Sequence, residues 1–75
     1  MKTYTLIDTF NSSIISRHRS LLAAVRASGQ HARAIRRRNG GNAYVTYEIT
    51  GTDGKKVDYY DLINAEETVR LERIR

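Results

Sequence analysis

The sequence predicts a small α+β domain built on a four-stranded antiparallel sheet, with its elements in the order β-β-α-β-β-α. One long helix packs on one face of this sheet, and a short helix ends the chain. Three patterns support this prediction: β-branched and aromatic residues in 3–10 and 43–50, a helical apolar repeat after Ser20, and a hairpin signal at Asp53-Gly54. The length of 75 residues suits one domain, 1–75.

The first quarter of the chain predicts a β-hairpin that leads into a helix. Residues 3–10 have the composition of a strand, residues 11–13 (Asn-Ser-Ser) supply a turn, and residues 14–17 return as a short second strand. Ser20 is the expected N-cap of the helix, because its hydroxyl can accept a hydrogen bond from an unpaired N–H of the first turn.

The long helix is expected to end at Arg38 or Asn39. Its apolar and small residues recur at intervals of four and three, which places them on one face. They are Leu21, Val25, Ser28, Ala32 and Ile35. Gly40-Gly41 then supplies a C-cap and a loop, because glycine readily adopts the positive φ required there. Basic residues in the last turn also suit the negative end of the helix dipole.

The second half predicts two more strands and a final helix. Residues 43–50 alternate as a strand does, Asp53-Gly54 favours a tight hairpin, and residues 55–60 are expected to return as the last strand. Asn64 is the expected cap of the terminal helix, with Glu67 three residues later as its capping-box partner. The residues that would bury this helix are Leu62, Ala65, Val69 and Ile74.

The composition excludes several classes of function. The chain has no cysteine, so disulfides, zinc–thiolate sites and a cysteine nucleophile are ruled out and a reducing compartment is expected. The first residues lack the apolar region of a signal peptide, and the longest apolar run, 21–25, is too short to span a bilayer. We therefore expect a cytoplasmic protein without a membrane partner. A homodimer is one further expectation, because dimerisation would relieve the thin core of so small a domain.

Positive charge is concentrated in the middle of the chain. The net charge is +5, but the segment between Asp8 and Glu48 contains no acid and carries seven arginines. They are Arg17, Arg19, Arg26, Arg33, Arg36, Arg37 and Arg38. Such asymmetry predicts a docking face for an anionic partner. The alternative is a solvated helix face that the acidic C-terminal third neutralises.

Four long polar side chains of the predicted helix fall within one narrow arc, away from its apolar face. They are Arg26, Gln30, Arg33 and Arg37, and they form a row roughly 16 Å long. Arg36 and Arg38 extend this candidate surface at the end of the helix. Arginine binds phosphates and carboxylates bidentately, so the row suits a nucleic-acid backbone and an acidic protein surface equally well.

A second candidate site is Arg17-His18-Arg19, beside the start of the helix. An anion held there would gain two arginines and the N–H groups of the first turn. The alternative is an exposed strand end whose charges discourage edge pairing.

Residues 41–47 partly resemble the RNP1 strand of RNA-recognition motifs. The matching positions are Gly41, Ala43, Tyr44, Val45 and Tyr47. Gly40 and Asn42 depart from the pattern, which normally has a basic residue and an aromatic residue there. Tyr44 is the candidate base-stacking residue, and an ordinary tyrosine on the sheet surface is the alternative.

The histidines do not predict a catalytic or metal site. His18 and His31 are thirteen residues apart in the sequence, with no third ligand type at a suitable spacing, and neither is paired with a carboxylate by spacing. Gly40-Gly41 ends a helix and does not open one, so it is not a phosphate-binding loop. We therefore expect a non-enzymatic protein without a cofactor or a metal.

Four strings of the sequence carry a resemblance. They are Asp8-Thr9-Phe10-Asn11, Ile15-Ser16-Arg17-His18-Arg19, Ala23-Ala24-Val25-Arg26-Ala27 and residues 39–47. Together they resemble a family of very small proteins from proteobacterial phages, plasmids and integrated elements. The resemblance implies an origin in a mobile element, and hence the cytoplasm of a bacterial host, but it implies no activity. In size and type the chain is also similar to phage-encoded anti-CRISPR inhibitors.

Two hypotheses for the function follow. The first is a binding protein whose arginine-rich helix engages an anionic macromolecule, either nucleic acid or an acidic protein surface. The alternative is an anti-CRISPR-type inhibitor that binds a host defence complex, such as a CRISPR effector, by protein–protein contact. A small nuclease that uses a histidine is a third, more remote hypothesis.

Overall fold

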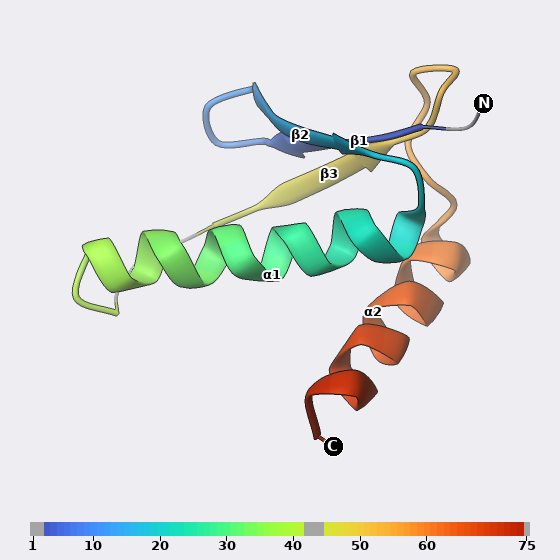
Figure 1. The fold of residues 1–75 in the computed structure, drawn as a ribbon. Coiled ribbons are helices and arrows are strands. Elements are labelled where there is room, and N and C mark those ends of the chain that lie inside the picture. The colour runs from blue at the N-terminus through green and yellow to red at the C-terminus, as the bar shows by residue number, and fades with distance from the viewer. Residues whose placement is uncertain (1–2, 42–44, 75) are drawn as a thin grey trace.

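Three strands and two helices make up the computed structural model, which describes residues 3–41 and 45–74 (Figure 1). The elements are β1 (Tyr4–Asp8), β2 (Ser13–His18), α1 (Leu21–Arg38), β3 (Tyr47–Thr50) and α2 (Tyr59–Ile74). The α+β class is therefore confirmed. The predicted four strands and the β-β-α-β-β-α order are wrong, because the chain runs β-β-α-β-α.

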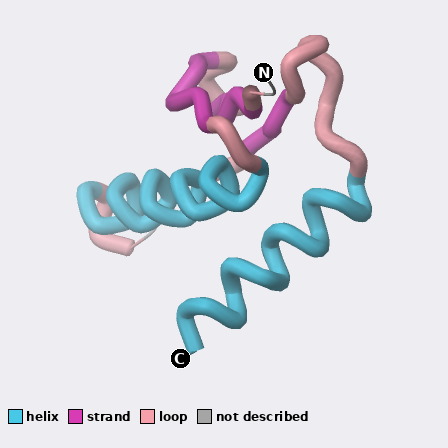
Figure 2. Tube along the Cα trace, turned by 45° about the vertical axis from the view of Figure 1, so that its right-hand side comes forward, coloured by secondary structure: helices cyan, strands magenta, loops and turns pink. Residues whose placement is uncertain are grey.

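The sheet is antiparallel, with β1 in the centre and the strand order β2-β1-β3. Leu6 of β1 pairs with Ser16 on one side and with Ile49 on the other. The register shifts after Leu6, so that Ile15 is an extra residue in β2, as in a β-bulge. Both helices lie on the same side of the sheet, as Figures 1 and 2 agree in showing. The opposite face of the sheet has no helix over it in the part of the chain that the structure describes.

Local signals define α1 at both ends. Ser20 is the N-cap, as predicted, and its hydroxyl accepts a hydrogen bond from the Ala23 N–H at 3.1 Å. The helix ends at Arg38, where the Gly41 N–H donates to the Arg36 carbonyl at 2.6 Å. Gly41 has a φ of 93°, which residues with a Cβ rarely adopt. The predicted helix boundaries are therefore confirmed.

The predicted strand over 43–50 is observed in shortened form as β3, and residues 42–44 lie outside the described part of the chain. The turn at Asp53-Gly54 is present, with Gly54 at a φ of 80°. Across this turn the Gly51 N–H donates to the Lys55 carbonyl at 2.8 Å.

Residues 55–60, which were expected to form a fourth strand, do not. After the turn the chain makes one isolated bridge, between Thr50 and Lys56. The Val57 N–H then donates to the Ile49 carbonyl at 3.0 Å. Pairing stops there, which leaves most of the outer edge of β3 without a neighbouring strand in the described residues.

The reason is that Asp58 starts a helix. Its Oδ1 accepts a hydrogen bond from the Tyr60 N–H at 2.9 Å, and its carbonyl accepts one from the Leu62 N–H at 3.0 Å. Both bonds satisfy donors of a first helical turn. The helix therefore begins at Tyr59, and the prediction that Asn64 caps it is wrong. The C-terminal helix has 16 residues and is not short beside the 18 residues of α1.

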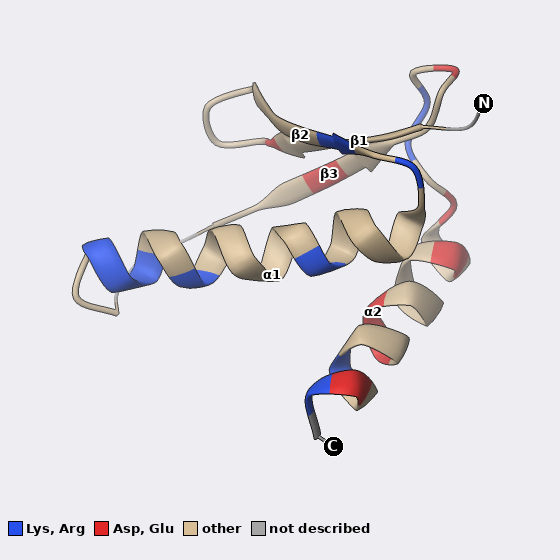
Figure 3. Cartoon of the chain, in the orientation of Figure 1, with Lys and Arg blue, Asp and Glu red and all other residues tan. Residues whose placement is uncertain are grey.

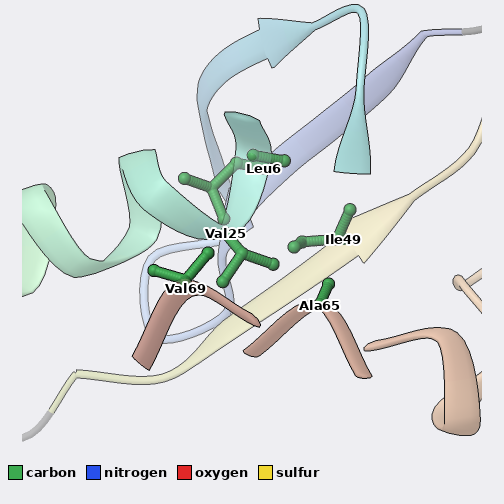
Figure 4. Close-up of a cluster of buried hydrophobic side chains, with 6 residues drawn as sticks. Leu6, Val25, Ile49, Ala65 and Val69 are labelled. Carbon is green, nitrogen blue, oxygen red and sulfur yellow. The ribbon is translucent and has the colours of Figure 1, made fainter. Parts of the chain in front are cut away.

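The core lies where both helices meet the sheet (Figure 4). It consists of Leu6, Ala24, Val25, Ile49, Ala65 and Val69. Leu6 and Ala24 are fully buried, and Ala24 lets α1 approach the sheet closely because its side chain is small. The predicted apolar face of α1 is confirmed at Val25 and Ala32, which are buried. None of the helices, over the residues described, is long and apolar enough to cross a membrane.

Candidate anion-binding surface

Arg26, the first member of the predicted basic row, is already bound within the chain. Its Nε donates to Glu72 Oε1 at 3.0 Å and its Nη2 donates to Glu72 Oε2 at 2.7 Å. This hydrogen-bonded pair raises the pKa of Arg26 above its ordinary value. The pair joins α1 to α2, so the Arg26 guanidinium is already occupied by a carboxylate of the chain.

The remaining arginines gather at the C-terminal end of α1. We call this set the arginine cluster: Arg33, Arg36, Arg37 and Arg38. All its members are exposed, as is Gln30 one turn earlier. None of the four forms an ion pair with a carboxylate of residues 3–41 or 45–74. The last turns of α1 are blue in Figure 3, whereas the red acidic residues lie on the strands, in the loop before α2 and on α2.

Two glycines, Gly40 and Gly41, follow the arginine cluster. A Cβ added to Gly40 or Gly41 would meet no atom within 4 Å. Both glycines are exposed, and they turn the chain away directly after the last arginine.

Arg17, His18 and Arg19 are not part of this surface. They lie before the start of α1, whereas the arginine cluster lies in its second half, about 18–26 Å further along the helix. The Nε2 atom of His18 is 2.7 Å from the hydroxyl of Ser16, so its ring is held at the strand. The structure therefore separates the two predicted basic sites.

Of the two tyrosines in the predicted RNP1-like segment, the structure describes only Tyr47. Tyr44, the candidate stacking residue, lies outside the described residues. Tyr47 lies on the helix side of the sheet, where its ring meets His31 edge-on with the ring centres 6.1 Å apart. Its hydroxyl is buried, so Tyr47 offers no exposed ring of the kind that stacks on a base.

A polar group that spacing did not predict lies where β1 meets α1. Asp8 is buried, and its Oδ2 is 3.9 Å from Nε2 of His31. Its Oδ1 accepts a hydrogen bond from the Phe10 N–H at 2.9 Å, which holds the β1–β2 turn. The Tyr47 hydroxyl next to this group has no hydrogen-bond partner within the described chain. Its burial raises the pKa of Tyr47 above 10.0, although Arg36 opposes the shift.

The role of Asp8 in the turn can be predicted from the sequence, because aspartate commonly accepts a hydrogen bond from the N–H two residues later, here that of Phe10. The contact of Asp8 with His31 cannot be predicted in this way, since 23 residues separate the two. No group of three or more metal-ligand residues is found among the residues that the structure describes.

A cavity of about 540 Å³ lies between α1, β3 and α2. Apolar side chains of the core, Val25, Ile49 and Val69, are among its lining residues. Charged side chains of α2 also line it: Glu66, Glu67, Arg70 and Arg73.

Comparison of the chain with protein-family models, with curated proteins and with solved structures gave no match.

Proposed function

We propose that this protein is a non-enzymatic binding module that holds an anionic macromolecule, in the first place nucleic acid, on the arginine cluster at the end of α1. The observation that carries the proposal is the exposure of four arginines with no carboxylate partner among the described residues. Their charges repel one another, by a few tenths of a kcal/mol for a pair such as Arg33 and Arg37 four residues apart. An anionic partner would relieve that repulsion.

The spacing of the arginine cluster suits a phosphate backbone. From Arg33 to Arg38 the helix rises about 8 Å. Phosphates of one DNA strand follow at about 3.4 Å of axial rise, so guanidinium groups spread over about 8 Å can reach more than one of them. Each guanidinium can bind a phosphate through two N–H donors.

The surroundings of the arginine cluster favour nucleic acid over an acidic protein. Protein interfaces are anchored by apolar and aromatic side chains at their centres, whereas nucleic-acid interfaces are polar and positively charged. The large exposed apolar side chains of the described residues lie elsewhere, in the β1–β2 hairpin and on α2. None of them belongs to α1.

The setting proposed for this function is the cytoplasm of a bacterial host, in the service of a mobile element. The sequence resemblance supports that setting. An anti-CRISPR-type inhibitor would place the same arginines on an acidic surface of a defence complex, and the experiment below separates the two partners.

The test compares two charge-matched variants for binding to a short labelled DNA duplex by fluorescence anisotropy. Arg33→Gln/Arg37→Gln removes two charges from the arginine cluster, and Lys55→Gln/Lys56→Gln removes two exposed charges from a distant loop. We expect the arginine variant to bind about tenfold more weakly and the lysine variant to bind almost as the unmodified protein does. Equal losses in both would show that only net charge matters.

In a second titration, polyglutamate is added to the complex of the protein with labelled DNA, and the release of the DNA is measured. Release of the DNA at a carboxylate concentration similar to the phosphate concentration at which DNA binds would favour an acidic protein partner. No release of the DNA would favour recognition of phosphate.

A further inference from the structure

The cavity between α1, β3 and α2 has the size of a site for a small ligand. Its volume of about 540 Å³ lies within the range of about 300–1,000 Å³ that is usual for ligand pockets. Val25, Ile49 and Val69, one from each of the three elements, are among its lining residues (Figure 4). Side chains of this kind favour aliphatic groups, because such groups gain free energy when they leave water.

Four charged side chains of α2 line the same cavity, and two of them neutralise each other. Glu67 and Arg70 form a bidentate ion pair. The side chains of Glu66 and Arg73 make no hydrogen bond or ion pair within residues 3–41 and 45–74. The cavity therefore presents one unpaired carboxylate and one unpaired guanidinium to a ligand.

These two unpaired charges lie along one side of α2. Glu66 and Arg73 are seven residues apart, which is about two turns, so the helix separates them by about 10 Å of rise. Val69, which is buried in the core, lies between them in the sequence and also lines the cavity. A ligand that runs along α2 between the two charges would therefore cover an apolar surface.

The Arg73 side chain extends from α2 to α1. A Cβ added to Gly29 of α1 would collide with the Arg73 guanidinium, so the absence of a side chain at Gly29 makes room for that group. Gly29 lies within a helix, where glycine is unfavourable, and it also lines the cavity. The guanidinium is thus placed beside the cavity while its N–H donors have no carboxylate partner among the described residues.

An aliphatic tripeptide with free ends matches these features. Arginine binds a carboxylate through two N–H donors, and a carboxylate binds an ammonium group through charge-assisted hydrogen bonds. Three extended residues span at most about 10–11 Å, which is close to the separation of Glu66 and Arg73 along α2. A single amino acid is too short to reach both charges, and an apolar acid without an amine would leave Glu66 unpaired.

From these observations we infer that the cavity binds a short apolar peptide of about three residues. Its C-terminal carboxylate lies at Arg73, its N-terminal ammonium lies at Glu66, and its side chains lie against Val25, Ile49 and Val69. This inference goes beyond the proposed function and does not depend on it, because the cavity is lined by no residue of the arginine cluster.

The test is isothermal titration calorimetry of the full chain with the tripeptide Val-Ala-Val. The free peptide is expected to bind, and N-acetylation or C-amidation should each weaken binding about tenfold, because each removes one charge-assisted contact. Ser-Gly-Ser has the same charged ends without aliphatic side chains, and it should bind much more weakly. Absence of binding by Val-Ala-Val at millimolar concentrations, or equal binding of the two free peptides, would overturn the inference.

Matched variants of the protein locate the two ends. Glu66→Gln should weaken binding of the free peptide about tenfold and should have no further effect on the acetylated peptide. Arg73→Gln should behave in the same way toward the amidated peptide. A variant that had lost its fold would instead bind every peptide less tightly, so these comparisons separate contact from folding.

Two further variants control for net charge. Asp61→Asn and Lys55→Gln remove the same charges from exposed positions that do not line the cavity, and both should bind the free peptide as the unmodified protein does. Equal losses in Glu66→Gln and Asp61→Asn, or equal binding of the free and end-blocked peptides, would contradict the inference. None of these results would change the outcome of the DNA-binding test.

Discussion

Arg26 of α1 and Glu72 of α2 form a bidentate pair, with N···O distances of 3.0 and 2.7 Å. The pair connects positions 46 residues apart in the sequence. It links the C-terminal turns of α2 to the first half of α1, and it separates one arginine that is bound within the chain from four that have no carboxylate partner among the described residues.

The first prediction concerns this division of roles. Arg26→Gln should lower Tm slightly, because an exposed ion pair contributes little to stability. It should leave DNA affinity close to that of the unmodified protein, since Arg26 is already bound. Thermal unfolding and anisotropy measured on the same preparation check both points. If Arg26→Gln weakened DNA binding as much as Arg37→Gln, the distinction between Arg26 and the arginine cluster would be wrong.

The buried hydroxyl of Tyr47 gives a second prediction. This hydroxyl has no hydrogen-bond partner among the described residues, so Tyr47→Phe should be neutral or should stabilise the fold by up to about 1 kcal/mol. Chemical denaturation at neutral pH measures the change. A loss of stability would mean that the hydroxyl makes a favourable contact in solution.

The same residue predicts a dependence on pH. Burial raises the pKa of Tyr47 in the folded state above its ordinary value of 10.0. As pH rises past 10.0, the unfolded chain loses this proton first, which favours unfolding. The resulting penalty on the folded state is absent below that pH and is complete once pH passes the folded-state pKa. The free energy of unfolding should therefore fall more steeply above pH 10.0 in the unmodified protein than in Tyr47→Phe.

The third prediction concerns the core. Leu6 is fully buried at the centre of the sheet, under both helices, and Leu6→Ala should cost about 3–5 kcal/mol. That cost is a large part of the stability of a small domain. Ile14→Ala is the control, because Ile14 is 54% exposed and should cost much less. Similar losses in the two variants, by chemical denaturation, would contradict the observed core.

Gly29 provides a fourth prediction. It lies within α1, where glycine costs about 1 kcal/mol relative to alanine. An added Cβ would collide only with the guanidinium end of Arg73, which is exposed and can move. Gly29→Ala should therefore stabilise the protein by about 0.5–1 kcal/mol. Destabilisation would show that Arg73 is held firmly against α1.

The features that the sequence predicted correctly depend on neighbours in the chain. The Ser20 cap, the end of α1 before the two glycines and the turn at Asp53-Gly54 each need only a few consecutive residues. Their side-chain and backbone preferences act within one turn, so they can be recognised without knowledge of the rest of the fold.

The fourth strand failed because two local preferences compete over residues 55–60. Val57 and Tyr59 have the alternation of a strand, but Asp58 between them is also a good N-cap. Starting the helix at Tyr59 adds a turn that partly buries Leu62 against the core, which a strand ending at residue 60 would not allow. Tertiary burial thus favoured the helix over the strand pattern.

The candidate site was predictable in outline only. Helical periodicity predicted that Arg26 and Arg37 share one side of α1, and both side chains are exposed in the structure. Whether a carboxylate meets them depends on where α2 packs, and helical periodicity contains no information about that position. The pair of Asp8 with His31 is missed for the same reason, since it joins β1 to α1 through the fold.

The most direct test of the central claim is the salt dependence of DNA binding, measured for the unmodified protein and for Arg36→Gln/Arg37→Gln. If the arginine cluster contacts phosphate, the slope of log K against log salt should be about −2 to −4 for the unmodified protein. Removal of two contacts should make the slope less steep by about 1.8. A slope near zero, or an identical slope in the two proteins, would contradict the assignment of the arginine cluster as the site of binding.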